Sequence, residues 1–227
     1  FGAMRLPIID DDSSNIDEEE AVRLIRYGID NGINYVDTAW PYHYGESEKV
    51  VGKALKDGYR KQVYLATKLP IWKVEKKEDL DKYLNKQLEK LQVEKIDFYL
   101  LHALNAERWQ KIKDLDILEW GEKKKEEGRI DYLGFSFHDS PDVFNEILAG
   151  HDWDFCQIQY NYLDAEYQAG KAGLQKAYAE GIGVVIMEPI RGGWLAQTPP
   201  QAAAQLFKSE NEDRSPVEWA LHWLWSQ

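Results

Sequence analysis

The chain has 227 residues, which is enough to bury one sizeable hydrophobic core. Its 28 Lys and Arg residues against 40 Asp and Glu residues give a formal net charge of −12, which argues against a protein that neutralises nucleic-acid phosphates. The single cysteine, Cys156, excludes an internal disulfide and suits a reducing compartment, which predicts a cytoplasmic protein. The longest apolar runs, such as residues 183–187, fall far short of a membrane span.

Short apolar runs alternate along the chain with longer segments of helical period. Strands are predicted over residues 33–36, 63–67, 96–101, 132–136, 155–159 and 183–187. Amphipathic helices are predicted over residues 17–31, 46–56, 77–91, 108–127, 142–148, 165–180 and 216–225. Because the strand runs are continuously apolar and recur at roughly 30-residue intervals, they predict a parallel sheet built from βαβ crossovers.

Two architectures are built from such units: an open doubly wound sheet and a closed barrel. The doubly wound nucleotide binders carry G-x-G-x-x-G or G-x-x-x-x-G-K-[ST], and neither pattern occurs in this sequence. Polar residues close successive strand runs, which is typical of the C-terminal face of a barrel. We therefore predict an α/β chain with a (β/α)8 TIM barrel. Residues 1–227 are expected to be one domain, with a clipped first strand at residues 1–6 and a truncation before the eighth βα unit.

Ionisable side chains end three consecutive strand runs. Asp37, Lys68 and His102 are expected to meet at one end of the barrel, and Tyr42 follows Asp37 on the same loop. A Lys beside a Tyr hydroxyl favours the phenolate and lowers the pKa of the phenol, while an Asp keeps the Lys charged. A nearby His can orient a carbonyl oxygen. This set of residues predicts a proton donor for an oxygen that gains negative charge, as carbonyl reduction requires.

These residues resemble the aldo/keto reductase family. The segments N-Y-V-D-T-A at 34–39 and Y-H-Y-G-E-S-E at 42–48 are similar to the family signature, and Lys68 and His102 stand where its Lys and His belong. The resemblance implies reduction of an aldehyde or ketone by hydride transfer from NAD(P)H. It implies Tyr42 as general acid, Lys68 as the residue that lowers the pKa of Tyr42, Asp37 as the partner of Lys68, and His102 as the residue that orients the substrate.

The resemblance also implies cofactor positions. Ser136, in the segment G-F-S at 134–136, and Gln157 correspond to residues that contact the nicotinamide carboxamide. The segment M-E-P-I-R-G-G at 187–193 resembles the loop around the pyrophosphate. Its candidate residues are Met187, Pro189, Ile190, Arg191 and Gly192. The implied cofactor is NADP(H), with NAD(H) as the other candidate. The likeness extends to a microbial branch with a C-terminal iron–sulfur tail, so a cluster is expected only if such a tail exists outside this sequence.

Two tryptophans follow the strands that carry Asp37 and Lys68. Trp40 and Trp72 are candidates for an aromatic wall around a small carbonyl substrate, with rim packing as the other interpretation. No metal site is predicted, because the five His residues form neither H-x-H nor H-E-x-x-H. We expect a small-molecule substrate and neither a nucleic-acid nor a membrane partner, and the sequence does not predict an oligomeric state.

Two other functions could use residues of this set. A serine hydrolase would use Ser136 with His102 and Asp37, but the segment G-F-S-F-H lacks the final glycine of G-x-S-x-G and leaves Lys68 and Tyr42 without a role. The second alternative is a nucleotide-sensing regulatory subunit with the same fold and little turnover. An intact set of four catalytic positions favours the enzyme over the sensor.

Overall fold

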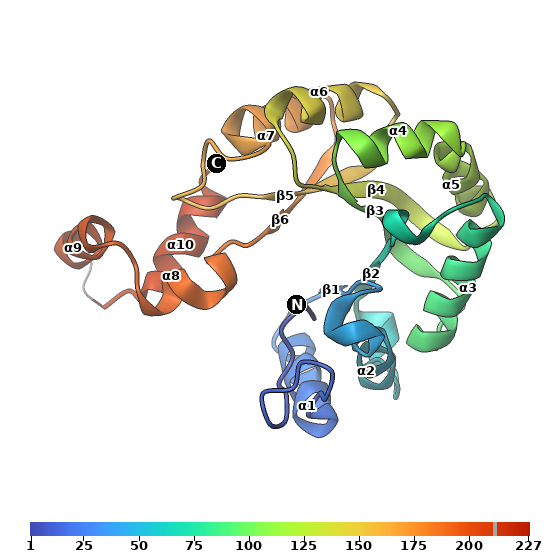
Figure 1. Ribbon diagram of the computed structural model, residues 1–227. Coiled ribbons are helices and arrows are strands. Elements are labelled where there is room, and N and C mark those ends of the chain that lie inside the picture. Colours follow the sequence, from blue (N-terminus) through green and yellow to red (C-terminus); the bar gives the residue numbers. More distant parts are fainter. Residues whose placement is uncertain (211–212) are drawn as a thin grey trace. The chain divides into compact units, whose positions relative to one another are not determined.

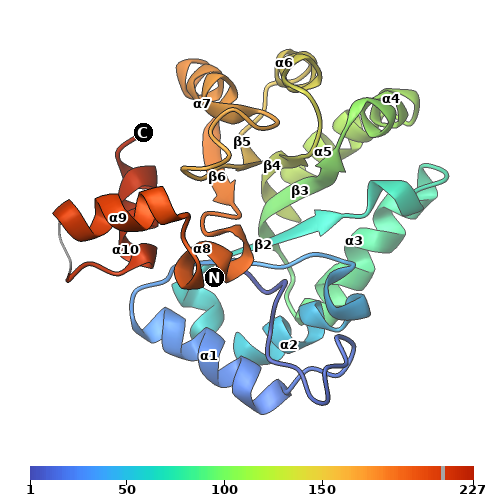
Figure 2. The same cartoon turned by 60° about the vertical axis from the view of Figure 1, so that its left-hand side comes forward.

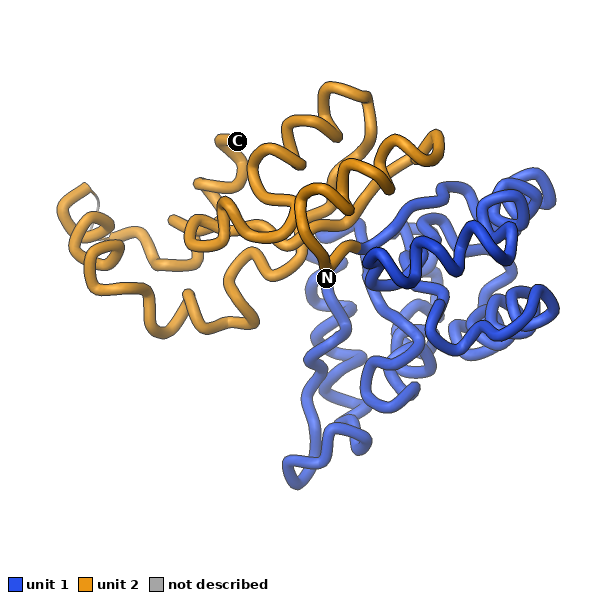
Figure 3. The backbone as a smooth tube through the Cα atoms, turned by 45° about the horizontal axis from the view of Figure 1, so that its top comes forward, with its two compact units in different colours: residues 1–136 blue, residues 137–227 orange. Residues whose placement is uncertain are grey.

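The computed structural model describes residues 1–210 and 213–227 of the chain. Two compact units make it up, residues 1–136 (unit 1) and residues 137–227 (unit 2), which have different colours in Figure 3. Strands and helices alternate in both units, in the βα order that the hydrophobic pattern predicts (Figure 1). Within the described part of the chain, no helix is both long enough and apolar enough to cross a membrane.

Unit 1 contains four strands and the helices that connect them. Its strands are β1 (Tyr35–Asp37), β2 (Tyr64–Leu69), β3 (Ile96–Leu104) and β4 (Ile130–Phe137), the last ending one residue into unit 2. Its α-helices are α1 (Glu18–Asp30), α2 (Ser47–Ala54), α3 (Glu78–Leu91), α4 (Ala106–Asp114) and α5 (Ile117–Glu126). Single 3-10 turns lie at Tyr42–Gly45, Tyr59–Gln62 and Ile71–Lys73.

The strands of unit 1 pair in parallel and in chain order. Asp37 of β1 lies opposite Ala66 of β2, and β2 pairs in turn with β3. The strand expected over residues 1–6 is reduced to a single parallel bridge between Gly2 and Asp37. Two backbone hydrogen bonds of 2.8 Å hold this segment beside β1, from Ala3 to Asp37 and from Asp37 to Phe1. The beginning of the chain therefore borders the strand that carries Asp37.

The two faces of these strands have different contacts. On one face, the Tyr99 hydroxyl of β3 donates a hydrogen bond of 2.7 Å to Gln87 of α3, so this face packs on helices. On the opposite face, Tyr35 of β1 meets Phe98 of β3 edge to face, with ring centroids 5.4 Å apart. Asp37 follows Tyr35 by two residues and shares its face, because side chains alternate along a strand. The predicted catalytic side chains therefore belong to the face that does not pack on helices.

The helix predicted over residues 108–127 is wrong in one respect, because it is two helices. α4 ends at Asp114 and α5 begins at Ile117, and Asp116 between them has a left-handed backbone with φ 49°. Asp tolerates this conformation better than most residues because its short side chain can bond locally to the backbone. The apolar period continues through the break, which is why the sequence alone predicts one helix.

Unit 2 contains two parallel strands and five α-helices among its described residues. The strands are β5 (Phe155–Gln159) and β6 (Gly183–Met187). The helices are α6 (Pro141–Ala149), α7 (Gly170–Ala179), α8 (Trp194–Gln197), α9 (Gln201–Glu210) and α10 (Pro216–Trp225). Figures 1 and 2 show α8, α9 and α10 gathered in the last part of the chain. α8 and α9 were not predicted, and neither has a long apolar stripe in the sequence.

Candidate active site

A buried ion pair joins β1 to β2. Lys68 Nζ donates hydrogen bonds to both carboxylate oxygens of Asp37, at 2.7 and 2.8 Å, and to the carbonyl oxygen of Thr38 at 2.8 Å. The Lys68 side chain is 1% exposed. Burial lowers the pKa of the Lys68 ammonium, but Asp37 and Tyr42 outweigh burial and hold that pKa above its ordinary value. Lys68 therefore stays charged although its side chain is almost fully buried.

Tyr42 lies against the same ammonium. The Lys68 Nζ donates to the Tyr42 hydroxyl at 3.4 Å and lies 4.9 Å from the centre of the phenol ring. Burial raises the pKa of Tyr42 above its ordinary value of 10.0, and Lys68 opposes this only in part. The expected effect of Lys68, which is to lower this pKa, is present, but the loss of hydration is the larger effect and keeps the pKa above its ordinary value.

The turn that carries Tyr42 has a strained backbone. The next two residues, His43 and Tyr44, have left-handed conformations with φ 51° and 54°, and Gly45 has φ 99°. A left-handed conformation costs roughly 1–2 kcal/mol for a residue with a Cβ atom, so the surrounding contacts must offset this cost. These residues directly follow Tyr42, so the turn fixes the backbone beside the phenol.

His43 provides one of the contacts that hold this turn. Its Nε2 accepts a hydrogen bond of 3.0 Å from the backbone amide of Leu6, and its Nδ1 lies 2.8 Å from the carbonyl oxygen of Ser13. A carbonyl can only accept, so Nδ1 carries the proton and the ring is neutral. The buried imidazole therefore ties the first residues of the chain to the turn beside Tyr42. Sequence reasoning did not find this role, because no partner of His43 is near it in the chain.

His102, on strand β3, lies next to Tyr42. The Tyr42 and His102 rings are 6.1 Å apart and nearly perpendicular, and the His102 ring lies 5.2 Å from Trp72. All three line an open pocket of about 480 Å³. Unit 1 thus brings Asp37, Lys68, Tyr42 and His102 together at the ends of three strands. Their catalytic roles stay a prediction.

The two candidate substrate tryptophans lie in different surroundings. Trp72 lines the pocket with Tyr42 and His102, whereas Trp40 is not among the residues that the structure describes in its lining. The Trp40 ring packs edge to face on Tyr83 at 4.9 Å, and Lys90 Nζ lies 3.9 Å from the ring centre. These contacts agree with the rim-packing interpretation of Trp40, and contact with a substrate stays a prediction for both residues.

A buried glutamate behind β2 is a further feature that sequence reasoning missed. The Glu48 carboxylate is fully buried, accepts hydrogen bonds from Thr67 Oγ1 at 2.8 Å and Gln87 Nε2 at 2.7 Å, and pairs with Lys90 at 3.2 Å. A buried carboxylate is stable only when its charge is paired and its oxygens are hydrogen-bonded, and Glu48 meets both conditions. Its place among the apolar residues of the helix predicted over 46–56 was the available signal.

Gln87 connects this glutamate to the candidate catalytic lysine. Its Nε2 also donates to the backbone carbonyl of Lys68 at 3.0 Å, and its Oε1 accepts from the Tyr99 hydroxyl at 2.7 Å. Burial raises the pKa of Tyr99 well above its ordinary value, so this hydroxyl remains a donor. The buried polar network of Glu48, Thr67, Gln87 and Tyr99 therefore fixes the backbone from which the Lys68 side chain extends.

The end of β3 positions Ser136. Ala103, directly after His102, has a left-handed backbone with φ 53°, and its amide donates to Ser136 Oγ at 2.7 Å. The Ala103 carbonyl accepts a hydrogen bond from the Arg108 guanidinium, which lies over the Trp72 ring at 5.1 Å. Ser136 is 1% exposed and keeps its own hydroxyl proton to donate. A hydroxyl held in this way suits a carboxamide partner.

Four of the candidate cofactor residues of unit 2 follow β6 directly, and Gln157 lies on β5. Gln157 is 5% exposed, and Met187 is the last residue of β6. In the loop that follows, Arg191 and Gly192 have left-handed conformations with φ 48° and 65°, as Glu188 does with φ 57°. Pro189 and Ile190 lie between them. The loop bends sharply, and such a backbone is a common feature of segments that wrap a ligand.

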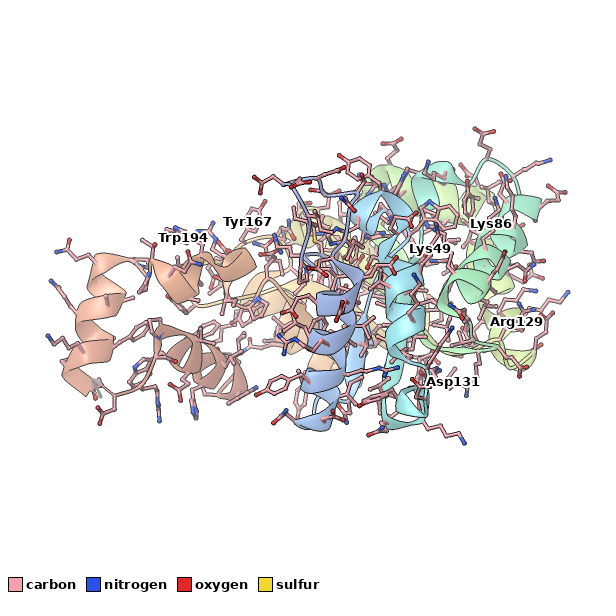
Figure 4. All side chains as sticks on the ribbon, turned by 90° about the horizontal axis from the view of Figure 1, so that it is seen from below. Lys49, Lys86, Arg129, Asp131, Tyr167 and Trp194 are labelled. Atoms are coloured by element: carbon pink, nitrogen blue, oxygen red, sulfur yellow. The ribbon has the colours of Figure 1, made fainter. Side chains whose placement is uncertain are left out.

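Asp164 holds this loop and was not predicted. The Arg191 Nε lies 3.1 Å from Asp164 Oδ2, and Asn161 donates to the same oxygen at 2.8 Å and to the Glu188 carbonyl at 3.1 Å. The Arg191 guanidinium also lies 5.6 Å from the ring centre of Trp194, which Figure 4 shows at the surface. Arg191 is thus directed by one carboxylate and one ring.

The Cys156 thiol has no chemistry that the site would use. Burial raises the pKa of the Cys156 thiol to about 12, so this thiol stays protonated and unreactive at neutral pH. Among residues 1–210 and 213–227, no group of three or more His, Cys, Asp and Glu side chains is arranged to hold a metal ion.

Comparison with known proteins identifies the family. The aldo/keto reductase family profile matches residues 1–226. The chain belongs to this family. The aldo-keto reductase AKR11C1 of Bacillus halodurans, in its holo form, superposes on 97% of the chain and 75% of its own length, with 30% identity and a TM-score of 0.78. This match in fold confirms the predicted (β/α)8 barrel class.

Curated relatives are similar in sequence and longer than this chain. The protein named "Probable aldo-keto reductase 1" of Glycine max is 29% identical over all of the chain and 73% of its own length. The "Aldo-keto reductase yakc [NADP(+)]" of Schizosaccharomyces pombe is 28% identical over 86% of the chain, which spans 58% of that relative. An aldo/keto reductase from Klebsiella pneumoniae solved with NADP and acetate has 24% identity, a TM-score of 0.75 and coverage of 98% of this chain and 75% of its own.

Proposed function

We propose that this aldo/keto reductase family member reduces an aldehyde or ketone with NADPH and that Tyr42 is the general acid. The observation that carries this proposal is the buried contact of Lys68 with both Asp37 and Tyr42, at 2.7 and 3.4 Å. A charged lysine whose side chain is buried stabilises negative charge on a neighbouring oxygen far better than an exposed lysine would. Such a group is what a carbonyl oxygen requires as it becomes an alkoxide.

The cofactor would be held by residues of three segments. These residues are Ser136, Gln157 and, in the loop after β6, Met187, Pro189, Ile190, Arg191 and Gly192. The donor set fits, since a buried hydroxyl and a buried amide suit a carboxamide, and a guanidinium suits a pyrophosphate. NADP(H) is favoured by the names of the yeast relative and of the Klebsiella structure, with NAD(H) as the alternative. When bound, the reduced nicotinamide supplies the hydride for the carbonyl carbon. No iron–sulfur cluster is assigned to the residues of this chain.

The side chains of unit 1 would supply the proton that the carbonyl oxygen requires. The Tyr42 hydroxyl donates its proton to the carbonyl oxygen, and Lys68 stabilises the phenolate that remains. Asp37 keeps Lys68 charged and directed at the phenol oxygen. His102, beside both Tyr42 and Trp72, orients the substrate oxygen. Because the pKa of Tyr42 is raised, the phenol is protonated and ready to donate throughout the neutral range.

Substitution of Tyr42 tests this assignment. We expect Tyr42→Phe to abolish NADPH-dependent reduction of a panel of aldehydes and ketones while leaving NADPH affinity, measured by calorimetry, nearly unchanged. Tyr44→Phe is the matched control, because Tyr44 lies in the same strained turn but is 82% exposed. Turnover that survives in Tyr42→Phe would overturn the role of Tyr42. Nucleotide binding without turnover by the unsubstituted protein would favour the nucleotide-sensing subunit instead.

The pH dependence tests the role of Lys68. Reduction uses the protonated phenol, so its rate should fall only as the pH rises past the raised pKa of Tyr42. The reverse reaction, alcohol oxidation, uses the phenolate, so its rate should increase as the pH rises towards that pKa. Lys68→Met removes a cation that lowers the pKa of Tyr42 and should move the oxidation profile to higher pH. If Lys68→Met is slow but its pH–rate profile for oxidation is unchanged, the role of Lys68 is structural only.

We also propose the cytoplasm as the place of action, on the single cysteine, and one (β/α) barrel domain over residues 1–227 as the functional body. Immunofluorescence and limited proteolysis test these two points.

A further inference from the structure

The pocket beside Tyr42 and His102 contains one permanent charge among its described lining residues. Arg108, in the first turn of α4, lines this pocket with Trp72 and His102. Lys68 lies behind Tyr42 and is neutralised by Asp37 at 2.7 Å. Within residues 1–136, no Asp or Glu side chain forms an ion pair with Arg108. The pocket therefore presents a positive charge that the protein does not balance locally.

Arg108 is held in a fixed position by two contacts that leave most of its donors unused. One N–H donates to the carbonyl of Ala103, and the guanidinium carbon lies 5.1 Å from the centre of the Trp72 ring. The cation–ring contact does not require a hydrogen bond, and a guanidinium has five N–H donors in a rigid fork. A half-buried, positioned fork of this kind matches the two oxygens of a carboxylate.

The positive charge of Arg108 contrasts with the negative net charge of the whole chain. The net charge of −12 repels anions at long range, but exposed charges are screened beyond about 8 Å at physiological salt. At contact distance the local cation dominates. An acidic protein that keeps an unbalanced arginine in its candidate substrate pocket is arranged to accept a specific anion.

We propose that the substrate carries a carboxylate as well as its carbonyl group, and that Arg108 binds this carboxylate. The proposal rests on the function proposed above, since it names the substrate class of the same pocket. The carbonyl would lie at Tyr42 and His102, and the carboxylate beyond Trp72. Arg108 is a specificity-determining residue in this arrangement and has no part in the transfer of the proton.

A pair of isosteric aldehydes tests the proposal. We expect kcat/KM of the full-length protein for 4-formylbenzoate to exceed that for 4-formylbenzamide by about 10- to 100-fold, which is the typical effect of a hydrogen bond to a charged group. In Arg108→Met this ratio should fall towards one, chiefly through a higher KM for the carboxylate. Arg108→Lys, which keeps the charge but loses the fork, should fall between the two.

Lys111→Met is the matched control, because Lys111 lies on the same helix and outside the described lining of the pocket, and its removal changes the net charge equally. Its preference for the carboxylate should equal that of the unsubstituted protein. Equal kcat/KM values for the acid and the amide would overturn the proposal while the proposed carbonyl reduction stands. A preference that Arg108→Met and Lys111→Met lower equally would overturn it too. Absence of turnover with both aldehydes and with the wider panel would overturn the proposed function and, with it, this proposal.

Discussion

In unit 1, five of the six residues of the strand that carries Lys68 are buried, whereas in unit 2 none of the five residues of the strand that leads to the Met187–Gly192 loop is buried. The catalytic candidates of unit 1 are held by hydrogen bonds among buried charged groups, such as Lys68 with Asp37. The cofactor candidates of unit 2 are held by a partly exposed ion pair, Arg191 with Asp164. The proton-transfer residues therefore have a rigid setting, and the loop can adapt.

The last helices of unit 2 are also less buried than the strands of unit 1. α9 has no buried residue, and α10 has one, Ala220. These helices meet through aromatic rings: Phe207 stacks on Trp219 at 5.4 Å and meets Tyr162 edge to face at 5.9 Å. Ring contacts of this kind contribute about 0.5–1.5 kcal/mol each beyond area burial, which is less than a buried polar network loses when one member is removed. We expect unit 1 to resist unfolding better than unit 2.

The largest effect should come from breaking the buried network of unit 1. Glu48→Ala leaves Lys90 without its carboxylate and the donors of Thr67 and Gln87 without an acceptor, so the free energy of unfolding should fall by about 3–5 kcal/mol in urea titrations. Glu46→Ala is the control, because the pair of Glu46 with Lys49 is exposed, as Figure 4 shows for Lys49, and should cost less than about 1 kcal/mol. Similar losses in both variants would contradict the network's importance.

A smaller effect should come from the aromatic cluster of unit 2. Phe207→Ala removes the stacked ring against Trp219 and the contact with Tyr162, and should destabilise α9 and α10 by about 2 kcal/mol. Hydrogen exchange followed by mass spectrometry should show faster exchange in peptides of unit 2 and little change in β1 to β3. Leu206→Ala, at a 57% exposed position of the same helix, should have a weaker effect. Uniform acceleration through unit 1 would argue against the difference between the units.

The smallest effect on stability should come from two glycines with left-handed backbones. Comparing them separates the cost of backbone strain from an effect on catalysis. Gly45→Ala and Gly58→Ala each place a Cβ at a left-handed position, with φ 99° and 92°, and each should cost about 1 kcal/mol in thermal unfolding. Only Gly45 lies in the turn after Tyr42, so only Gly45→Ala should also lower kcat for carbonyl reduction. Equal activity in the two variants would show that the turn does not position Tyr42.

The strand ends were predictable because their residues follow local rules. Asp37, Lys68 and His102 close apolar runs, and parallel strands bring their ends to one edge. The break at Asp116 and the short helices α8 and α9 were not predictable, because they depend on left-handed residues and packing rather than on an apolar period. Glu48 and His43 were missed for a related reason, since the partners that explain them lie far away in the chain.

The amino-acid sequence by itself determined the alternation of strands and helices, the family and the kinds of residue at the strand ends, because period, composition and spacing are local properties. Only the tertiary structure decided the direction of the Tyr42 pKa, since burial outweighs Lys68 there. It also decided that Trp72 lines the pocket while Trp40 packs on Tyr83. The tertiary structure also decided that the positive charge of Arg108 lies in the pocket. The sequence alone gives only a negative net charge for the whole chain. The physical reason is that the burial of a side chain and the balance of charges around it depend on residues that are far apart in the sequence and meet only in the folded chain.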